Sequence, residues 1–398
     1  MSIDRFCRGF LSDLSAQGYD VVVVSSPGRE LATIAERERV RTVELPMERH
    51  ISVLKDMRSV WRMIKILKRE TPEIVHSITP KAGLVTMMAA WVAGVPIRVH
   101  TFTGLIFPTS RGVKKRLLKT IDKLMCRFAT HVVAEGNGVR NLLQQNKVTR
   151  KPIRVLGNGS IAGVDVDFFN VDAVDSSSAM RDAAELNTSE INPEKIDEIK
   201  RFTFIFVGRL VGDKGVNELV AAFSRLSEED GGCQLLLVGE SERTLDPLKP
   251  ATECIMDTNP DIVRVGNRDD VRPWLLRADV LVLPSYREGF PNVVLEAGAM
   301  GKPSIVTDVP GSNEIISTGF NGLIVPAYDS EGLYLAMKTL MNNPATARQM
   351  GVNARKNVVD KYNRKYVHQC ASEFYKELVS EAGGAVLSHK SAIVDGNG

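Results

Sequence analysis

Two cations follow a short apolar segment and have a spacing that suits a diphosphate group. Phe206-Val207-Gly208 leads into Arg209, and Lys214 follows five residues later. A glycine permits close approach of the backbone, an arginine offers a fork of donors, and a lysine adds a point charge. A helix predicted to begin near Val216 would add the partial positive charge of its N-terminus. A strand-to-helix turn with solvated charges fits the same residues, so both interpretations stay open.

Two carboxylates form a second group with a spacing of eight residues. Glu288 and Glu296 flank the turn Gly289-Phe290-Pro291-Asn292. Because proline favours the first turn of a helix, we expect Glu288 in the preceding loop and Glu296 about one turn into the helix. Carboxylates placed in this way can accept hydrogen bonds from two vicinal sugar hydroxyls, and free N–H groups at the helix start can hold a phosphate. A capping carboxylate beside an unrelated surface glutamate is the alternative.

Short β-branched segments alternate with helical stretches, and this alternation must position both groups. Such a pattern predicts parallel sheets that are covered by helices on both faces. The predicted strands are Tyr19–Ser25, Glu73–His76, Ile97–Thr101, His131–Ala134 and Arg154–Leu156, and then Thr203–Val207, Gln234–Val238, Ile262–Val265, Val280–Pro284, Ser304–Thr307 and Gly322–Val325. Both chemical groups follow predicted strands of the second set, at the sheet edge where open α/β sheets bind ligands.

The two sets of strands predict two doubly wound domains in tandem. The predicted parts are an N-terminal domain at 1–170, a linker at 171–200, a C-terminal domain at 201–360, a helix crossing back at 361–382 and a disordered tail at 383–398. The linker is acidic and has no strand pattern, and the tail contains glycines and has no periodicity.

Composition and charge narrow the class of protein. Hydrophobic residues make up 43% of the chain and charged residues 25%, as in an average globular protein, which excludes a disordered chain and a collagen. The five cysteines have no C-x-x-C spacing, which fits a reducing cytosol and predicts no zinc site. Residues 1–155 carry 27 Lys and Arg against 13 Asp and Glu, whereas the rest carry 24 against 35. This asymmetry predicts two domains with different partners.

The basic half contains two amphipathic helical patterns. The first has cations at every fourth position, with apolar residues beside them: Arg111, Lys115, Lys119, Lys123 and Arg127, with Leu117, Ile121, Leu124 and Phe128. The second has six cations around Trp61 and Ile64: Lys55, Arg58, Arg62, Lys65, Lys68 and Arg69. Such faces suit an anionic membrane surface, although two ordinary surface helices are the alternative. We find no nucleic-acid recognition module and expect no nucleic-acid partner.

Taken together, the segments resemble one known family, the retaining glycosyltransferases of family 4 with the GT-B fold. Ser285–Ala297 resembles its E-x7-E motif, and Phe206–Gly215 resembles its diphosphate-binding turn. Val306–Glu314 and Asn321–Pro326 match in order and spacing. The resemblance covers roughly residues 18–380. It is nearest to bacterial polysaccharide enzymes that add sugars to a polyprenyl-diphosphate-linked glycan, and it implies two Rossmann-like domains that face each other across a cleft.

The resemblance also implies roles for matching residues. Arg209 and Lys214 would neutralise the donor diphosphate, a task otherwise given to a metal. Glu288 would contact the transferred sugar, and Glu296 would bind the ribose. The implied catalytic residues are Glu288, Arg209 and Lys214, and the implied substrate-binding residues are Gly208, Val265, Gly289, Phe290, Pro291, Asn292, Glu296, His100 and Thr103. Neither a cofactor nor a metal is expected.

Two departures from the family concern the first half of the chain. Family members usually open with a strand and a glycine-rich loop, whereas this chain begins in an apparent helix, so the first strand of the N-terminal domain is expected to be missing. Many members also carry a histidine in the loop after the strand Ile97–Thr101. Thr103 takes that place here, and His100 lies three residues earlier, as a substrate contact or as a strand-end residue with a satisfied ring.

We therefore expect a glycosyltransferase that uses a nucleotide sugar as donor and a lipid-linked or polysaccharide acceptor. UDP is the nucleotide that we favour for the donor. Its expected location is cytoplasmic, peripheral on the inner face of the cytoplasmic membrane. Two alternatives stay open. One is a nucleotide-sugar-binding protein that lacks activity because of the missing strand. The other is a nucleotide-sugar epimerase of the same fold, which the motif set disfavours.

Overall fold

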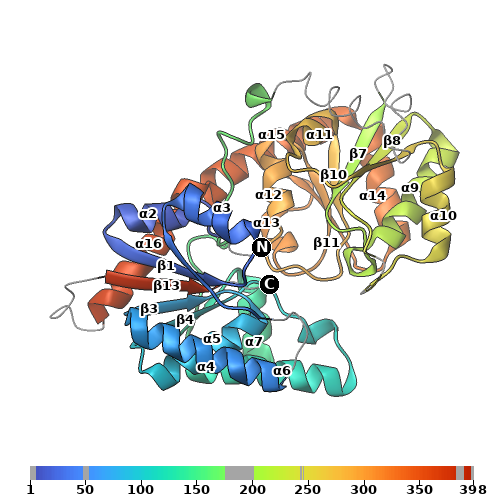
Figure 1. The fold of residues 1–398 in the computed structure, drawn as a ribbon. Helices are drawn as coiled ribbons and strands as arrows, with labels where there is room; N and C mark the ends of the chain where they lie inside the picture. The colour runs from blue at the N-terminus through green and yellow to red at the C-terminus, as the bar shows by residue number, and fades with distance from the viewer. Residues whose placement is uncertain are drawn as a thin grey trace. The chain divides into compact units, whose positions relative to one another are not determined.

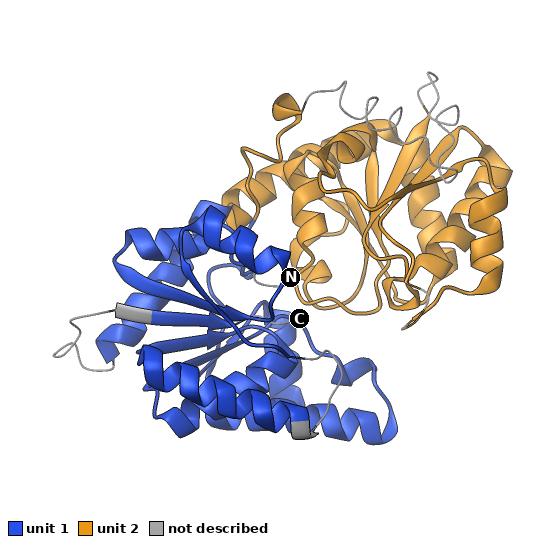
Figure 2. Ribbon diagram, viewed as in Figure 1, with its two compact units in different colours: residues 1–163, 364–398 blue, residues 164–363 orange. Residues whose placement is uncertain are grey.

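The computed structural model describes residues 6–47, 53–174, 201–242, 244, 246–381 and 390–395. The chain forms two compact units, unit 1 with residues 1–163 and 364–398, and unit 2 with residues 164–363 (Figure 2). Each unit contains one β-sheet with helices packed on it, and the paired strands of both sheets are parallel (Figure 1). The predicted α/β class with two doubly wound parallel sheets is confirmed.

The described residues of unit 1 form a seven-stranded sheet in the order β2-β1-β13-β3-β4-β5-β6. Its strands are β1 (Tyr19–Ser25), β2 (Arg41–Glu44), β3 (Ile74–Ser77), β4 (Ile97–Phe102), β5 (His131–Ala134), β6 (Ile153–Arg154) and β13 (Lys390–Asp395). On β1, Val22 and Val24 belong to one apolar core, and Val21 and Val23 belong to the core of the opposite face. The strand is thus buried on both faces, which explains its continuous apolar run.

Helices cover both faces of this sheet. One core contains side chains of α4 (Val53–Glu70), α5 (Pro80–Ala93), α6 (Gly112–Phe128) and α7 (Asn137–Gln145). The other contains side chains of α2 (Phe10–Ala16), α3 (Arg29–Glu38) and α16 (Arg364–Glu381). A short 3-10 helix, η1 (Phe107–Thr109), precedes α6. The helix that follows unit 2 in the sequence, α16, thus belongs to the core of unit 1.

Strand β13 corrects the prediction of a disordered tail. It lies in the middle of the sheet, where Ile393 is in register with Val22 of β1 and with Val75 of β3. Ala392, Ile393 and Val394 are at most 2% exposed. The prediction gave weight to the surrounding glycines and missed this short apolar run, which is long enough for a central strand. In a sheet that was expected to lack its first strand, β13 lies between β1 and β3; residues 383–389 and 396–398 lie outside the described residues.

In the part of unit 2 that the structure describes, the sheet has six strands in the order β12-β11-β10-β7-β8-β9. Its strands are β7 (Phe202–Val207), β8 (Cys233–Val238), β9 (Ile262–Gly266), β10 (Val280–Leu283), β11 (Ser304–Thr307) and β12 (Gly322–Val325). Its helices are η2 (Val171–Ala173), η4 (Gly212–Lys214), α9 (Val216–Asp230), α10 (Pro250–Thr258), α11 (Arg272–Arg277), α12 (Asn292–Ala299), α13 (Ser312–Ile315), α14 (Ser330–Asn342) and α15 (Pro344–Tyr362). Of the predicted linker, residues 175–200 lie outside the described part of the chain.

Candidate functional site

Two neighbouring strands of unit 2 bring the predicted cations and the first predicted carboxylate to one edge of the sheet. Strands β7 and β10 pair in parallel at the centre of the sheet. Arg209 and Lys214 follow the carboxyl end of β7, and Glu288 follows the carboxyl end of β10. Parallel strands end at the same edge, and open α/β sheets bind their ligands at that edge.

Lys214 and Glu288 meet directly. The Nζ atom of Lys214 lies 2.6 Å from Oε1 of Glu288, and their side chains are 23% and 12% exposed. Gly215 makes this approach possible because it has a φ of +69°, and a Cβ atom there would lie 2.1 Å from the carbonyl oxygen of Pro284. Only a glycine lets the turn η4 pack this closely against the end of β10. The structure thus places one predicted cation beside the predicted sugar-binding carboxylate.

A second set of contacts fixes the loop that carries Glu288. Arg287 donates from Nη2 to Oδ2 of Asp213 at 2.6 Å, and the Tyr286 N–H donates to the Asp213 carbonyl oxygen at 2.9 Å. The Tyr286 hydroxyl donates to Glu218 at 2.5 Å, and the Asp213 N–H donates to Asp246 at 2.6 Å. We did not predict Asp213, Glu218 or Asp246 as site residues. They orient the loop from turns and a helix that are distant in sequence.

Arg209 points to a different carboxylate. Its Nη1 lies 2.5 Å from Oε2 of Glu242, and the arginine side chain is 57% exposed. Glu242 follows β8, which is the neighbour of β7 on the side away from β10. Sequence reasoning missed Glu242 because it belongs to none of the matching motifs. Arg209 is an exposed cation that can exchange this carboxylate for a phosphate oxygen.

The helix after the Glu288 loop begins with buried residues. Asn292 is 8% exposed, and Glu296 lies half-buried in the second turn of α12. Phe290 is 4% exposed, and its ring packs at 5.4 Å from the ring of Tyr362. The Phe290 side chain therefore belongs to the core, and only its backbone can serve a ligand. The same holds for Val265, whose side chain is fully buried at the end of β9.

Three buried polar atoms near this helix have no hydrogen-bond partner among the described residues. They are Ser285 Oγ, Asn292 Oδ1 and Ser312 Oγ. Ser312 follows Gly311, where a Cβ atom would lie 2.1 Å from the Gly289 carbonyl oxygen, so the two loops are in close contact. Buried polar groups are normally hydrogen-bonded, and hydroxyl and amide oxygens of this kind match the hydroxyls of a sugar.

Unit 1 contains the other two predicted contacts. His100 is 1% exposed, and its Nδ1 lies 2.8 Å from Ser77 Oγ. Burial lowers its pKa to about 3, which keeps the ring neutral. His100 is thus the strand-end residue with a satisfied ring that the sequence left as an alternative, and we do not include it in the site. Thr103 lies beyond the end of β4 and is half-buried.

His76 is also tied into unit 1. Its Nδ1 lies 2.7 Å from the Tyr375 hydroxyl, and its Nε2 lies 2.7 Å from Thr101 Oγ1. Burial lowers the pKa of this imidazole to about 4. Within the described ranges, no three His, Cys, Asp or Glu side chains form a group that could hold a metal ion.

The chain is similar to known glycosyltransferases. The family model "Glycosyl transferases group 1" matches residues 201–343, and "Glycosyl transferase 4-like domain" matches residues 3–159. The capsular polysaccharide biosynthesis glycosyltransferase CapM of Staphylococcus aureus is 30% identical over 385 residues, with 95% of each chain covered. An Escherichia coli relative, UDP-Gal:alpha-D-GlcNAc-diphosphoundecaprenol alpha-1,3-galactosyltransferase, is 29% identical over 321 residues, which cover 79% of this chain and 78% of that one.

A solved structure of similar fold is HepE of Anabaena in complex with UDP and glucose. Its TM-score is 0.73 at 16% identity, and the match covers 90% of this chain and 99% of HepE. At this level of identity the likeness concerns the fold.

Proposed function

Since the chain belongs to the group 1 glycosyltransferases of family 4, with the GT-B fold, we propose that it transfers a hexose or N-acetylhexosamine from a UDP-sugar. The acceptor is a polyprenyl-diphosphate-linked glycan or a polysaccharide, and the product belongs to bacterial surface polysaccharide synthesis. The observation that carries the donor site is the contact of Lys214 with Glu288 at the carboxyl edge of β7 and β10.

Relatives support the substrate classes. The Escherichia coli relative is named for UDP-galactose as its donor and for a diphosphoundecaprenol-linked sugar as its acceptor. A Campylobacter jejuni relative, 26% identical over 334 residues, is named as a transferase that acts on a diphospho-undecaprenol-linked sugar. An acceptor of this class would bring the enzyme to the inner face of the cytoplasmic membrane.

The cations of unit 2 receive the diphosphate in this proposal. In the structure, Lys214 is paired with Glu288 and Arg209 with Glu242. When the donor binds, the phosphate oxygens replace these carboxylates, and Glu288 becomes available to the hydroxyls of the transferred sugar. The two cations then stabilise the diphosphate as it leaves, and they supply the positive charge that a metal ion would otherwise supply.

The transfer proceeds with retention of the anomeric configuration. The bond between the sugar C1 and the diphosphate oxygen breaks, and the acceptor oxygen forms its bond to C1 on the same face. The acceptor proton passes to an oxygen of the departing diphosphate. Glu296 holds the ribose hydroxyls, and the N–H groups at the start of α12 support the sugar and phosphate oxygens.

Strand β13 bears on the alternative of an inactive binding protein. That alternative rested on a missing central strand, and β13 occupies the position between β1 and β3. The transfer assay separates the proposals. Purified protein is incubated with a panel of UDP-hexoses and UDP-N-acetylhexosamines and with an undecaprenyl-diphosphate-linked sugar. We expect UDP and an elongated α-linked product with one donor. Bound UDP without transfer from any donor would favour the binding protein, and donor conversion without acceptor would favour an epimerase.

A further inference from the structure

Tyr328 has a backbone conformation that a tyrosine rarely adopts. Its φ is +65°, in the left-handed region, where a side chain crowds the backbone and where glycine is unstrained. Of the unit 2 residues that the structure describes, it is the only one besides the glycines with a positive φ. It lies between β12 and α14, directly before Asp329, the N-cap residue of α14. Backbone strain of this kind is concentrated at functional sites.

The Tyr328 ring stacks on the ring of Tyr286. The two ring centres are 3.7 Å apart, and the ring planes differ by 30°. Tyr328 is nevertheless 64% exposed, so its side chain does not serve to fill the core. The stack joins the segment after β12 to the segment after β10, two strands that are separated by β11 in the sheet. Tyr328 thus stands at the carboxyl edge of the unit 2 sheet, where the candidate donor site lies.

Tyr286 connects the two halves of that site. Its N–H donates to the carbonyl oxygen of Asp213 at 2.9 Å. Asp213 directly precedes Lys214, and Tyr286 precedes Glu288 by two residues. This hydrogen bond therefore holds the loop of the predicted sugar-binding carboxylate against the turn of the predicted phosphate-binding cation. The ring of Tyr328 packs on the residue that makes the connection.

We infer that Tyr328 is a positioning residue for the transfer reaction: its ring holds Tyr286, and Tyr286 holds the Glu288 loop against the Lys214 turn. The inference rests on the proposed function, because it requires that Glu288 contacts the transferred sugar. A displacement of about 1 Å in a group that orients the reacting sugar can lower the rate roughly a hundredfold. The stack keeps the ring in place despite the left-handed backbone of Tyr328.

Amide hydrogen exchange of residues 285–289 in the full-length protein tests the contact itself. Tyr328→Ala removes the ring, so the hydrogen bond of the Tyr286 N–H should open more often and its exchange should be about tenfold faster. Tyr328→Phe keeps the ring and should exchange as wild type does. Unchanged exchange in Tyr328→Ala, or equally fast exchange in both variants, would overturn the inference.

Transfer kinetics test the consequence for the reaction, with the acceptor dissolved in detergent. Tyr328→Ala should lower kcat about ten- to a hundredfold, whereas its Kd for UDP should stay within about threefold of wild type. Tyr328→Phe should restore kcat to within about twofold. Equal losses of kcat and of UDP affinity in Tyr328→Ala would overturn the positioning role, because they would indicate direct contact of Tyr328 with the nucleotide.

Tyr328→Gly separates positioning from stability. Glycine adopts this φ without strain, so relief of the strain offsets loss of the ring and the Tm should stay within about 2 °C of wild type. Its kcat should still fall as far as in Tyr328→Ala. The control is Lys147, an exposed residue after α7 of unit 1 with a φ of +51°. Lys147→Gly should keep kcat; a fully active Tyr328→Gly, or an equal loss in Lys147→Gly, would overturn the inference.

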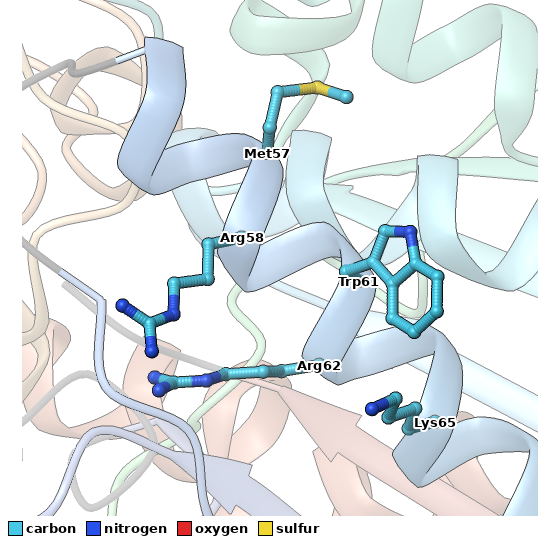
Figure 3. A pocket seen from close by; sticks show the side chains of 5 residues that line it. All are labelled: Met57, Arg58, Trp61, Arg62 and Lys65. Carbon is cyan, nitrogen blue, oxygen red and sulfur yellow. The ribbon is translucent and has the colours of Figure 1, made fainter.

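Trp61 provides a control for the loss of an exposed ring. It is 63% exposed, against 64% for Tyr328, and it lies on α4 in unit 1. The Lys65 Nζ atom lies 4.8 Å from the centre of its ring, and the two side chains line one groove (Figure 3). Trp61→Ala should leave both the exchange of residues 285–289 and the Kd for UDP unchanged. Faster exchange in Trp61→Ala, equal to that in Tyr328→Ala, would contradict a specific role of the stack.

Hydrogen exchange does not depend on transfer, so this inference and the proposed function can fail separately. Faster exchange in Tyr328→Ala, with no transfer by wild type from any donor, would overturn the proposed function and leave the role of Tyr328 in holding the loop. Transfer by wild type, with the same exchange in wild type and Tyr328→Ala, would overturn the positioning role and leave the glycosyltransferase intact.

Discussion

Removal of the Lys214 ammonium group should weaken UDP binding strongly. In the proposed site this group gives up its contact with Glu288 at 2.6 Å and donates to the diphosphate instead. A hydrogen bond to a charged group contributes about 1.5–3 kcal/mol, so Lys214→Ala should raise the Kd for UDP roughly 10- to 150-fold. Isothermal titration calorimetry with UDP measures the change directly.

Glu288→Gln should act in the opposite direction on UDP binding. The pair with Lys214 must part before the diphosphate binds, and a partly exposed pair of this kind is worth about 1 kcal/mol. UDP should therefore bind the variant up to about fivefold more tightly, although sugar transfer is lost. The double variant should resemble Lys214→Ala, because Glu288 acts on UDP binding through Lys214.

A cation elsewhere in unit 2 provides the control. Lys338 has a carboxylate partner, Asp230, at 3.0 Å on the surface of α14 and α9. Lys338→Ala should leave the Kd for UDP unchanged. Lys214 is not a diphosphate ligand if Lys214→Ala binds UDP as tightly as wild type, or if Glu288→Gln weakens UDP binding as much as Lys214→Ala does.

Three further predictions concern stability. Ile393→Ala in the centre of β13 should cost roughly 2–5 kcal/mol in a urea titration, against about 0.5 kcal/mol for Val352→Ala, whose side chain is 63% exposed. Gly215→Ala should lower both stability and UDP affinity, because its Cβ atom would lie 2.1 Å from a backbone oxygen. Gly232 has a φ of +64°, but no atom lies within 4 Å of an added Cβ, so Gly232→Ala should lower the free energy of unfolding by only about 1–2 kcal/mol. Equal losses for the two members of either pair would contradict the packing described. Burial raises the pKa of Asp122 from 3.8 to about 7, so the folded protein loses stability as pH rises through that range. Asp122→Asn should therefore raise the Tm above about pH 8 and leave it unchanged below about pH 4. An equal gain in Tm at both pH values would contradict the raised pKa.

The strands could be predicted where an apolar run was long or lay next to a motif. Tyr19–Ser25 forms β1 with those bounds, and the strands of unit 2 follow the predicted runs closely. Strand β13 was missed because only three of its residues, Ala392 to Val394, are apolar and glycines flank the segment in sequence. Its place between two strands from the first quarter of the chain depends on tertiary pairing, which local pattern does not encode.

The site could be predicted in part. The spacing of Lys214 and Glu288 in their motifs indicated one site, and the two side chains meet. Glu242 and Asp213 escaped prediction because their partners are distant in sequence and no motif marks them as ligands of a cation. Phe290 was predicted as a substrate contact because it belongs to the motif, but its ring packs in the core. The letters of a motif do not distinguish a residue that acts through its side chain from one that acts through its backbone.

A structure of the protein with UDP bound tests the donor site most directly. We expect the Lys214 Nζ atom within hydrogen-bond distance of a diphosphate oxygen, Glu288 turned away from Lys214, and Glu296 on the ribose hydroxyls. A diphosphate bound elsewhere, with the contact between Lys214 and Glu288 intact, would contradict it.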